Sequence, residues 1–358
     1  MAYTTINKST DYFETLLSTG DDGSQTFTGL DFQPDFVWSK RRQTHAHQLY
    51  DSVRTAGSGK ALQSDSDAAE GGDGGTYGYL SSFTSDGFAS TAGSSNNNYF
   101  NASGGTYVFW NWKAGTALNN SAGANGGSIA TTGSISSTSG FGIVKYVGTG
   151  SNATIYHGLG KIPRMIITKN IDQSFHWSVY TFNSNTKILR LNGTNAEATE
   201  TAFQSTDPTT TIQSLGTHNQ NNGSGDTHIS YMFCDVPGYQ KIGSYTGNGN
   251  ADGPFCFTGF KPAFVLGKRT DSAGGWWILD SKRPGFNLTD EYLLADSNQA
   301  EADDGSFASD FLSNGWKARA TNGNFNASGG TYIYMACASN PFVTSTGVPA
   351  LLFKAVPA

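Results

Sequence analysis

The amino-acid sequence predicts an all-β protein made of three tandem antiparallel, β-sandwich-like repeats of about 100 residues each. Three observations carry this prediction. The 358 residues include 45 glycines, 13% aromatic residues and only 14% charged residues, a composition of turns, strands and exposed sheet faces. Short runs of β-branched and aromatic residues alternate with Gly-rich turns, without a convincing amphipathic helix longer than about ten residues. An internal repeat divides the chain into three copies.

The repeat is clearest near the ends of the first and third copies. Residues 100–107 recur without change as residues 325–332, an offset of 225 positions. Identity over eight consecutive residues at such a distance indicates duplication of a structural unit. Each copy also contains a proline that precedes a lysine by six residues. These pairs are Pro34 and Lys40, Pro163 and Lys169, and Pro262 and Lys268.

A second landmark in each copy is a leucine followed by an acidic or amide residue and then by glutamate. The three sets are Leu62, Asp65 and Glu70; Leu189, Asn192 and Glu197; and Leu293, Asp296 and Glu301. Oxygen ligands at alternating positions suit a calcium ion, but the glycine of a calcium loop is not at its expected place. The alternative is a short helix that Asp or Asn starts and Glu caps in its first turn. The sequence favours the helix and leaves calcium open.

The repeats and the composition between them divide the chain into segments. These are an N-terminal arm (1–10), β repeat 1 (11–114), a Gly/Ser/Thr-rich linker (115–139), β repeat 2 (140–237), β repeat 3 (238–341) and a C-terminal tail (342–358). The linker is expected to be flexible or weakly stranded. Repeats 2 and 3 meet almost without a spacer, so we expect them to pack as a pair. The tail is apolar at residues 351–356 and is expected to dock on its own domain or on a neighbouring subunit.

Within the repeats, strand patterns recur in the same places. Residues 141–147 combine β-branched and aromatic residues and end at glycines, as a short strand does. Pro34, Pro163 and Pro262 are expected to open strands, where a missing N–H has the least effect. In residues 107–112 both alternating faces are largely apolar, which predicts a central strand covered on two sides. Separate sandwiches are the main prediction, and closure of the three units around a common axis stays open.

Charge and cysteine content limit the functional classes. With 22 basic and 28 acidic residues the net charge is −6, which gives no reason to approach nucleic acid or an anionic membrane. Without a run of about 18 apolar residues or a basic and then apolar leader, we expect no membrane insertion and no secretory signal. Cys234, Cys256 and Cys337 form no disulfide or metal motif and are expected to be buried thiols. This cysteine usage suits a chain made in a reducing cytoplasm.

Catalytic, cofactor and metal motifs do not emerge from the sequence. A nucleophile elbow, an HExxH motif and a phosphate-binding loop are all missing, and nothing nominates a carboxylate pair. We therefore predict that the chain is not an enzyme and holds no cofactor. His45 and His47 would share one face of a strand as half of a metal site, but a third ligand is missing. An exposed loop or strand edge is the favoured interpretation, and no metal is predicted.

Two Asp–Arg pairs and one tryptophan pair are the candidate surface or ligand-binding residues. They are Asp51 and Arg54, Asp280 and Arg283, and Trp276 and Trp277. An Asp and an Arg three residues apart can bind a sugar hydroxyl or a partner's carboxylate, or can pair with each other across a turn. The second repeat has other residue types at positions 181–183, so the fold does not require the pair. Neighbouring tryptophans in a strand point to opposite faces, so one of the two is expected at an interface or exposed.

Several segments together resemble a family of repeat-containing virion proteins of tailed phages. They are residues 1–6, the strand 33–40, and residues 85–88, 245–249 and 326–332. The family is abundant in marine and cyanobacterial phages, where its members are usually described as structural or tail-fibre-like proteins. The resemblance extends from Met1 to about Val348. It implies repeated β domains mounted on a virus particle, and it implies no catalytic or ligand residues.

The resemblance and the composition lead to one expected function and two alternatives. The expected function is a structural protein of the phage virion exterior, made in the host cytoplasm, as a tail fibre, spike or knob component that contributes to host-surface adhesion. One alternative is a capsid decoration or head-fibre protein. The other, of a different class, is a carbohydrate-binding, lectin-like module. The expected partners are further copies of the chain in a homotrimer, other virion proteins and a host cell-surface glycan, which several weak sites would bind by avidity.

Overall fold

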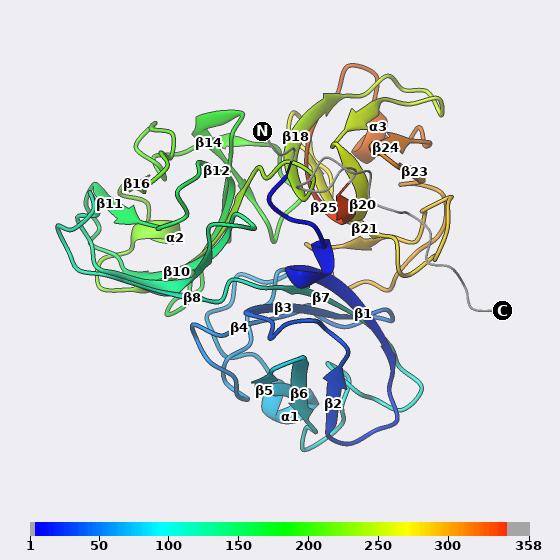
Figure 1. The fold of residues 1–358 in the computed structure, drawn as a ribbon, viewed down its shortest axis with the longest axis horizontal. Coiled ribbons are helices and arrows are strands. Elements are labelled where there is room, and N and C mark those ends of the chain that lie inside the picture. Colours follow the sequence, from blue (N-terminus) through cyan, green and yellow to red (C-terminus); the bar gives the residue numbers. More distant parts are fainter. Residues whose placement is uncertain (1–3, 342–358) are drawn as a thin grey trace.

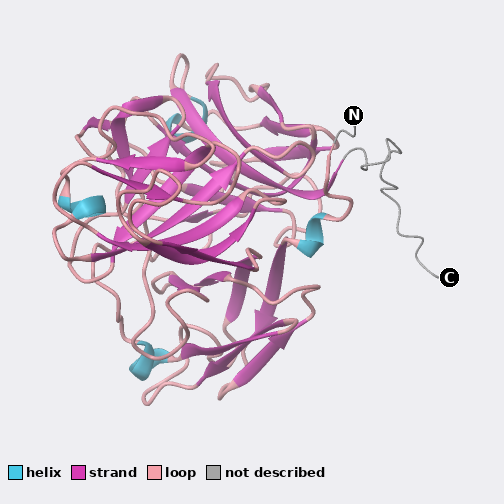
Figure 2. Cartoon of the chain, turned by 60° about the vertical axis from the view of Figure 1, so that its left-hand side comes forward, coloured by secondary structure: helices cyan, strands magenta, loops and turns pink. Residues whose placement is uncertain are grey.

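The protein folds almost entirely into antiparallel β-sheets. The computed structural model describes residues 4–341, and strands dominate the cartoon in Figure 2. Besides a 3₁₀ turn, η1 (Ser9–Asp11), its helices are α1 (Gly74–Tyr77), α2 (Asn219–Asn222) and α3 (Gly323–Asn326). Each helix has four residues, and none between residues 4 and 341 is long and apolar enough to cross a membrane. The all-β fold class is therefore confirmed.

Three sheets share one strand order, and we call them the inner sheets. The first runs in the order β1 (Phe13–Thr19), β7 (Thr106–Trp112), β3 (Phe36–Arg41) and β4 (Gln48–Asp51). The second runs β10 (Phe141–Val147), β17 (Thr227–Cys234), β12 (Pro163–Asn170), β13 (Ser178–Thr181), β14 (Ser184–Arg190) and β15 (Ala198–Thr199). The third runs β18 (Gln240–Thr246), β25 (Thr331–Pro341), β20 (Phe260–Arg269), β21 (Trp277–Asp280) and β22 (Leu293–Leu294). In each, the first and last of these strands along the chain lie side by side.

Each inner sheet is accompanied by a smaller outer sheet from the same stretch of chain, and together they form a unit. The outer sheet of the first unit is ordered β2 (Gln25–Thr28), β6 (Gly87–Thr91) and β5 (Tyr79–Thr84). In the second unit β11 (Ala153–Tyr156) pairs with β16 (Ile212–Leu215). The outer sheet of the third unit is ordered β19 (Phe255–Phe257), β24 (Gly315–Ala318) and β23 (Ser309–Leu312).

The segment predicted as a linker, residues 115–139, differs from that expectation. It contains β8 (Thr116–Asn120) and β9 (Thr131–Ser136), which extend the second inner sheet beside β10. Leu118, Ile129 and Ile135 of this segment are buried in the core of the second unit. Thr- and Ser-rich sequence forms strands readily once a few apolar residues anchor one face. Composition alone therefore hid two strands whose anchors are widely spaced.

The three units surround one common apolar core. Figure 1 shows them as lobes around a centre, blue for the first, green for the second and yellow to red for the third. The core takes residues from every unit, among them Trp38, Trp110, Trp112, Ile167, Trp177, Tyr231, Leu266, Trp276 and Met335. The other face of each inner sheet packs in a smaller core of its own unit. The units thus close around a common axis, the arrangement that the sequence left open.

Strand β7 explains why both faces of residues 107–112 are apolar. It lies between β1 and β3, and Val108, Trp110 and Trp112 point into the common core. Tyr107 and Phe109 pack in the core of the first unit. The prediction of a central strand covered on two sides is confirmed.

Other local predictions have mixed outcomes. Strand β12 begins at Pro163, as predicted, but Pro34 lies two residues before β3 and Pro262 lies inside β20 at a register shift, so neither of these two opens its strand. The three cysteines are free and buried, as expected. The short helix predicted at residues 65–70 and 296–301 is wrong, because neither segment is helical. The apolar run 351–356 lies outside the described residues.

Candidate functional site

The predicted surface residues Asp51 and Arg54 are buried, so they do not form an exposed site. Their side chains are 0% and 1% exposed and pair at 2.6 Å between Arg54 Nε and Asp51 Oδ2. Arg54 Nη1 lies 2.9 Å from the carboxylate of Glu70, the glutamate of the second sequence landmark. Burial by itself lowers the pKa of the Arg54 guanidinium, but the interactions with Asp51, Tyr231 and Glu70 together outweigh burial and raise it. The alternative of a pair that closes a turn describes these residues, although they are buried rather than exposed.

Asp280 and Arg283 repeat this geometry in the third unit. Arg283 Nε lies 2.6 Å from Asp280 Oδ2, and Arg283 Nη1 lies 2.8 Å from Glu301 Oε2. Both side chains of the Asp–Arg pair are 0% exposed. A guanidinium that contacts two carboxylates in the interior has its charge and most of its N–H groups satisfied. These residues stabilise a loop, and because both side chains are fully buried a ligand at the surface cannot reach them.

Each buried aspartate also receives a hydrogen bond from a neighbouring unit. The Tyr231 hydroxyl of the second unit donates to Asp51 at 2.7 Å. The Trp110 indole of the first unit donates to Asp280 at 3.0 Å. The matching position of the third unit is Met335, whose side chain has no N–H or O–H to donate. Its neighbour, the second unit, is the one without an Asp–Arg pair.

Trp276 and Trp277 are both buried, so neither is an exposed stacking platform. Both are 0% exposed. Trp277 packs in the core of the third unit, while Trp276 lies in the common core. The Trp276 indole donates to the carbonyl of Arg190 in the second unit at 2.9 Å. The expectation that one of the two lies at an interface holds for Trp276, and the interface is between units of the same chain.

Equivalent ring donors close the contacts among all three units. Each is the residue directly before the third strand, in chain order, of an inner sheet: His47 before β4, Trp177 before β13 and Trp276 before β21. Trp177 Nε1 donates to the Gln63 carbonyl at 2.9 Å. His47 Nε2 lies 3.0 Å from the Leu294 carbonyl, and Trp38 donates to His47 Nδ1 at 2.9 Å, so Nε2 carries the proton. His47 is therefore a buried link between units rather than the exposed histidine predicted from sequence.

The acidic landmarks complete the same ring through the backbone. Asp65, Asn192 and Asp296 accept hydrogen bonds from the backbone N–H groups of His47, Trp177 and Trp276, respectively. The backbone N–H groups of Glu70, Glu197 and Glu301 donate to the carbonyls of Ile171, Thr270 and Arg42, each in the next unit, at 2.8, 2.9 and 2.7 Å. These contacts run from the first unit to the second, from the second to the third, and from the third to the first. These backbone contacts and the ring N–H contacts of His47, Trp177 and Trp276 are together called the inter-unit ring.

The lysine that follows each strand-opening proline is also buried. Lys40, Lys169 and Lys268 are 0% exposed, and each donates to two backbone carbonyls. Burial lowers the pKa of Lys40 to about 7 and the pKa values of Lys169 and Lys268 to about 8. Lys268 reaches the Thr194 carbonyl of the second unit at 3.1 Å. The repeated lysine thus has a structural role, within its own unit for Lys40 and Lys169 and between units for Lys268.

The repeated landmarks lie at equivalent places in the three units, but the Asp–Arg pairs and the two tryptophans that were predicted as surface residues are buried. The feature that the sequence analysis missed is the ring N–H donor that directly precedes β4, β13 and β21. Its signal was available as His47, Trp177 and Trp276 at equivalent places in the three copies. Among residues 4–341 there is no group of three or more His, Cys, Asp or Glu side chains that could hold a metal ion.

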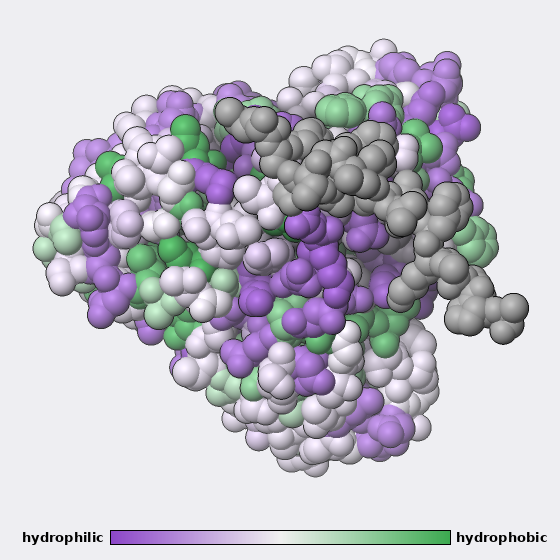
Figure 3. All heavy atoms as spheres, viewed as in Figure 1, coloured by the Kyte–Doolittle hydropathy of each residue, from purple (hydrophilic) through white to green (hydrophobic). Residues whose placement is uncertain are grey.

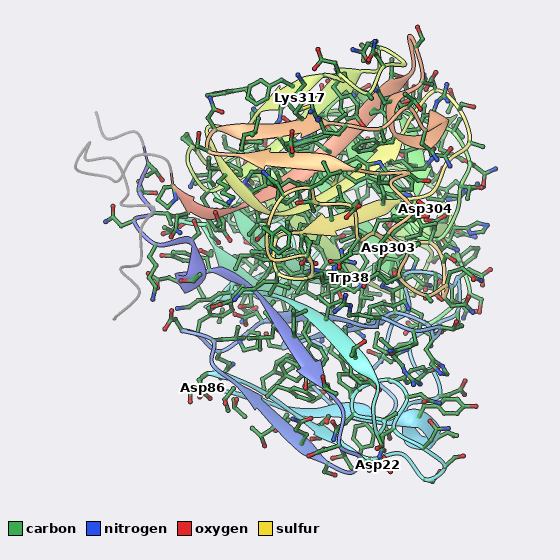
Figure 4. All side chains as sticks on the ribbon, turned by 90° about the vertical axis from the view of Figure 1, so that its right-hand side faces the viewer. Asp22, Trp38, Asp86, Asp303, Asp304 and Lys317 are labelled. Carbon is green, nitrogen blue, oxygen red and sulfur yellow. The ribbon has the colours of Figure 1, made fainter. Side chains whose placement is uncertain are left out.

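The exposed face of the third unit holds a polar groove, which is the candidate functional site. Two adjoining hollows of about 420 and 530 Å³ share Ala251 and Arg319 in their walls. The polar groups that line them are Asp252, Asp304, Ser306, Asp310, Arg319, Thr321 and Asn322. Figure 4 labels Asp303, Asp304 and Lys317 on this unit, far from Asp22 and Asp86 of the first unit. We call this site the third-unit groove.

Charges in the third-unit groove are paired but accessible. Asp252 is 76% exposed and lies 2.5 Å from Lys317 Nζ and 3.6 Å from Arg319 Nη1. Arg319 Nε lies 3.2 Å from Asp310. The hydrogen bond from Lys317 lowers the pKa of Asp252, and that from Ser306 lowers the pKa of Asp304. Both carboxylates are ionised at neutral pH and can accept hydrogen bonds from hydroxyl groups.

On the face shown in Figure 3, hydrophilic and near-neutral residues dominate, and hydrophobic atoms form separate small patches. A shallow groove with paired charges, hydroxyls and an amide offers both donors and acceptors to a polyhydroxylated ligand. The catalytic geometry of a glycosidase needs two carboxyl groups with different pKa values across a bound sugar. In the groove the pKa values of Asp252 and Asp304 are both shifted downward, so neither is suited to act as a general acid near neutral pH.

Comparison with known proteins identifies the family to which the chain belongs. A family model described as a domain of unknown function (DUF7483) matches residues 8–341. The match covers the inner and outer sheets of all three units. No curated protein matches the chain.

Proposed function

Since the chain belongs to the DUF7483 family over residues 8–341, we propose that it is a structural protein of the phage virion exterior that contributes to host-surface adhesion. The resemblance of five sequence segments to tail-fibre-like virion proteins motivates this proposal. The observation that carries the proposal is the third-unit groove, an accessible polar site outside the buried contacts between units. The chain acts by binding and not by catalysis.

The groove suits a glycan of the host surface. Sugar hydroxyls donate to carboxylates and accept from guanidinium and amide groups, and the groove presents all three. The hollows are open and polar, so each site is expected to bind weakly. Several copies on one particle would raise the overall affinity by avidity without any further contact.

A first experiment locates the protein on the particle. A nanobody against the purified chain would be applied to intact virions and imaged by cryo-electron microscopy. Label at the tail tip or tail sides supports host adhesion. Label over the head supports the capsid decoration alternative, and absence of label from purified particles overturns the virion proposal.

A second experiment tests the groove with host-envelope polysaccharide as the probe. Arg319→Ala and Asp252→Ala remove one cation and one carboxylate from the groove. Lys282→Ala is the matched control, because its side chain is also on the third unit and 54% exposed but faces Glu14 instead. We expect at least about tenfold weaker binding for the groove variants and unchanged binding for the control. Equal binding by all variants would remove the groove from the proposal.

The compact form favours a knob or a decoration protein over a fibre shaft. The units close into one ring around a common core, and the described chain contains no long helix for a coiled coil. The predicted homotrimer would need surfaces other than the inner faces of the sheets, since these are already used within one chain. Light scattering at micromolar concentration measures the oligomer, and a clean monomer would contradict the trimer.

A further inference from the structure

Strand β19 of the third unit presents an apolar edge. It stands at the end of its sheet, where β24 pairs with one side of it. Phe255 and Phe257 are 46% and 61% exposed, although Cys256 between them is buried. Exposed hydrophobic edge strands are templates for another strand, and proteins usually cover or charge them.

The free hydrogen-bonding groups of this edge can be identified from its ladder. The Pro254 carbonyl accepts from Ala318, and the Thr258 N–H donates to Asn314. Backbone groups alternate between the two edges of a strand, so those of Phe255 and Phe257 point away from β24. Between residues 4 and 341 the contact at this edge is the Tyr334 hydroxyl, 3.4 Å from the Phe257 carbonyl. The N–H groups of Phe255 and Phe257 are therefore available to a further strand.

The corresponding strand of the second unit is covered on both edges. β16 pairs with one edge of β11, and residues 127–131 run along the other. Ile129 N–H donates to the Thr154 carbonyl at 3.1 Å, and Thr154 N–H donates to Ser128 Oγ at 2.8 Å. Ile129 forms a parallel bridge with Ile155. The molecule thus shows how its own chain can close this edge.

The first unit handles the same edge differently. β2 is also an edge strand, and Thr28 lies opposite Gly87 as Phe257 lies opposite Gly315. By this register Thr26 and Thr28 stand where the third unit has Phe255 and Phe257. Threonines tolerate water, so β2 needs no cover. Of the three units, the third alone carries an edge that is both apolar and uncovered within the described residues.

An apolar segment follows the described residues in the sequence. β25 ends at Pro341, which pairs with Phe260, three residues after Phe257. Seventeen residues follow, and the run 351–356 reads Leu-Leu-Phe-Lys-Ala-Val. Because β25 and β19 belong to different sheets of the unit, the linking residues must cross about 10 Å between packed sheets, and the nine residues 342–350 can span up to about 30 Å. In an extended segment Leu351 and Phe353 share one face, as Phe255 and Phe257 do.

We propose that the segment 351–356 of the same chain adds to β19 as a strand and covers Phe255 and Phe257. The backbone N–H groups of these two residues then donate to the added segment, and Leu351 and Phe353 cover their rings. This mode is strand addition, in which main-chain hydrogen bonds bind and alternate side chains select. The segment 351–356 would then cover the edge of β19 as residues 127–131 cover the edge of β11.

Hydrogen–deuterium exchange on the full chain tests the proposal. The probes are the amides of Phe255 and Phe257, and the amides of Thr26 and Thr28 in β2 are the internal control. We expect the β19 amides to exchange at least about tenfold more slowly than those of β2. Leu351→Asp with Phe353→Asp should bring β19 to the exchange rate of β2, whereas Thr344→Asp with Thr346→Asp should leave it protected.

Three outcomes would overturn the proposal. The β19 amides could exchange as fast as those of β2 in the full chain. They could stay protected in the Leu351→Asp, Phe353→Asp variant, in which case another group covers them. Their protection could also disappear on dilution together with an oligomer seen by light scattering, which would assign the edge to the segment of a second copy. None of these results affects the virion proposal, which depends on the third-unit groove and on particle labelling.

Discussion

The second unit differs from the first and third at the loop that follows its third inner strand. The first and third units bury an Asp–Arg pair there, and a neighbouring unit donates a hydrogen bond to each aspartate. The second unit has Phe182 at this loop, packed against the common core, with Arg164 stacked 3.8 Å above its ring. The matching donor position of the third unit is occupied by Met335, which packs in the same core.

This difference teaches that the buried pair and the donor on the next unit form one arrangement. Where the aspartate is present, the next unit offers Tyr231 or Trp110. Where it is absent, the position that would donate is apolar. A buried carboxylate without its partners is destabilising, whereas an apolar contact needs none. The fold can therefore form without the Asp–Arg pair and its donor, but removal of only one of these groups should destabilise it.

The largest effect is expected from breaking the pair in one unit. Asp51→Ala leaves Arg54 buried beside Glu70 alone, and we expect a loss of about 3–5 kcal/mol in the free energy of unfolding. Urea denaturation measures it. The double variant Asp51→Thr, Arg54→Met removes both charges and places at position 51 the threonine that the second unit has at 181, so it should lose less than the single variant. If the double variant is the less stable of the two, the comparison between units fails.

A smaller loss is expected when the donor alone is removed. Tyr231→Phe keeps the ring in the common core but takes one hydrogen bond from the carboxylate of Asp51, which should cost about 1.5–3 kcal/mol. In the Asp51→Thr, Arg54→Met background the same substitution should have little effect, because no carboxylate remains to satisfy. A thermodynamic cycle of these variants, measured in urea, gives the coupling. Additive losses would show that Tyr231 and Asp51 act independently.

Comparison of the units also explains what the sequence could and could not predict. Strand patterns, the repeated Pro–Lys spacing and the Leu–Asp–Glu landmarks located the inner sheets, because burial on both faces leaves an apolar signature in residues such as 107–112. The burial of Asp51 and Arg54 was not predictable, because the sequence of a charged pair is the same whether it faces water or another unit. Strands β8 and β9 were missed because three widely spaced apolar residues were their only anchors. The groove comes from loops of separate strands, so no contiguous motif marked it.

A third prediction uses the buried lysines that all units share. The folded chain holds Lys40 with a pKa of about 7 and Lys169 and Lys268 with pKa values of about 8, below the ordinary value of 10.5. Between these values and 10.5 the unfolded chain binds more protons, so stability should rise with pH across this window. For Lys40 the gain from pH 7 to 9 should be about 2 kcal/mol. Burial raises the pKa of Cys337 from 9.0 to about 12, so loss of this proton from the unfolded chain opposes the rise above about pH 9. The trend should reverse above about pH 10.5, where the lysines of the unfolded chain have also lost their protons.

The control for this pH dependence replaces the three lysines and keeps the residues of the inter-unit ring. A Lys40→Met, Lys169→Met, Lys268→Met variant should lose the rise in urea midpoint between pH 7 and 9 and keep the fall at higher pH. Single Lys-to-Met variants should each remove part of the rise, with Lys40 contributing most because its pKa is lowered furthest. A triple variant with an unchanged pH profile would show that these lysines stay charged in the folded chain.

The smallest effect on stability is expected at the third-unit groove, which contrasts with the buried pairs. Asp252 contacts Lys317 and Arg319 as Asp51 contacts Arg54, but it is 76% exposed rather than buried. Exposed ion pairs gain little because water and salt screen them. Asp252→Asn should therefore leave the urea midpoint within experimental error while weakening binding of the host-envelope polysaccharide. A substantial loss of stability would place Asp252 with the structural charges of the molecule and would remove the distinction between a buried ring that holds the units together and an open groove that is free to bind.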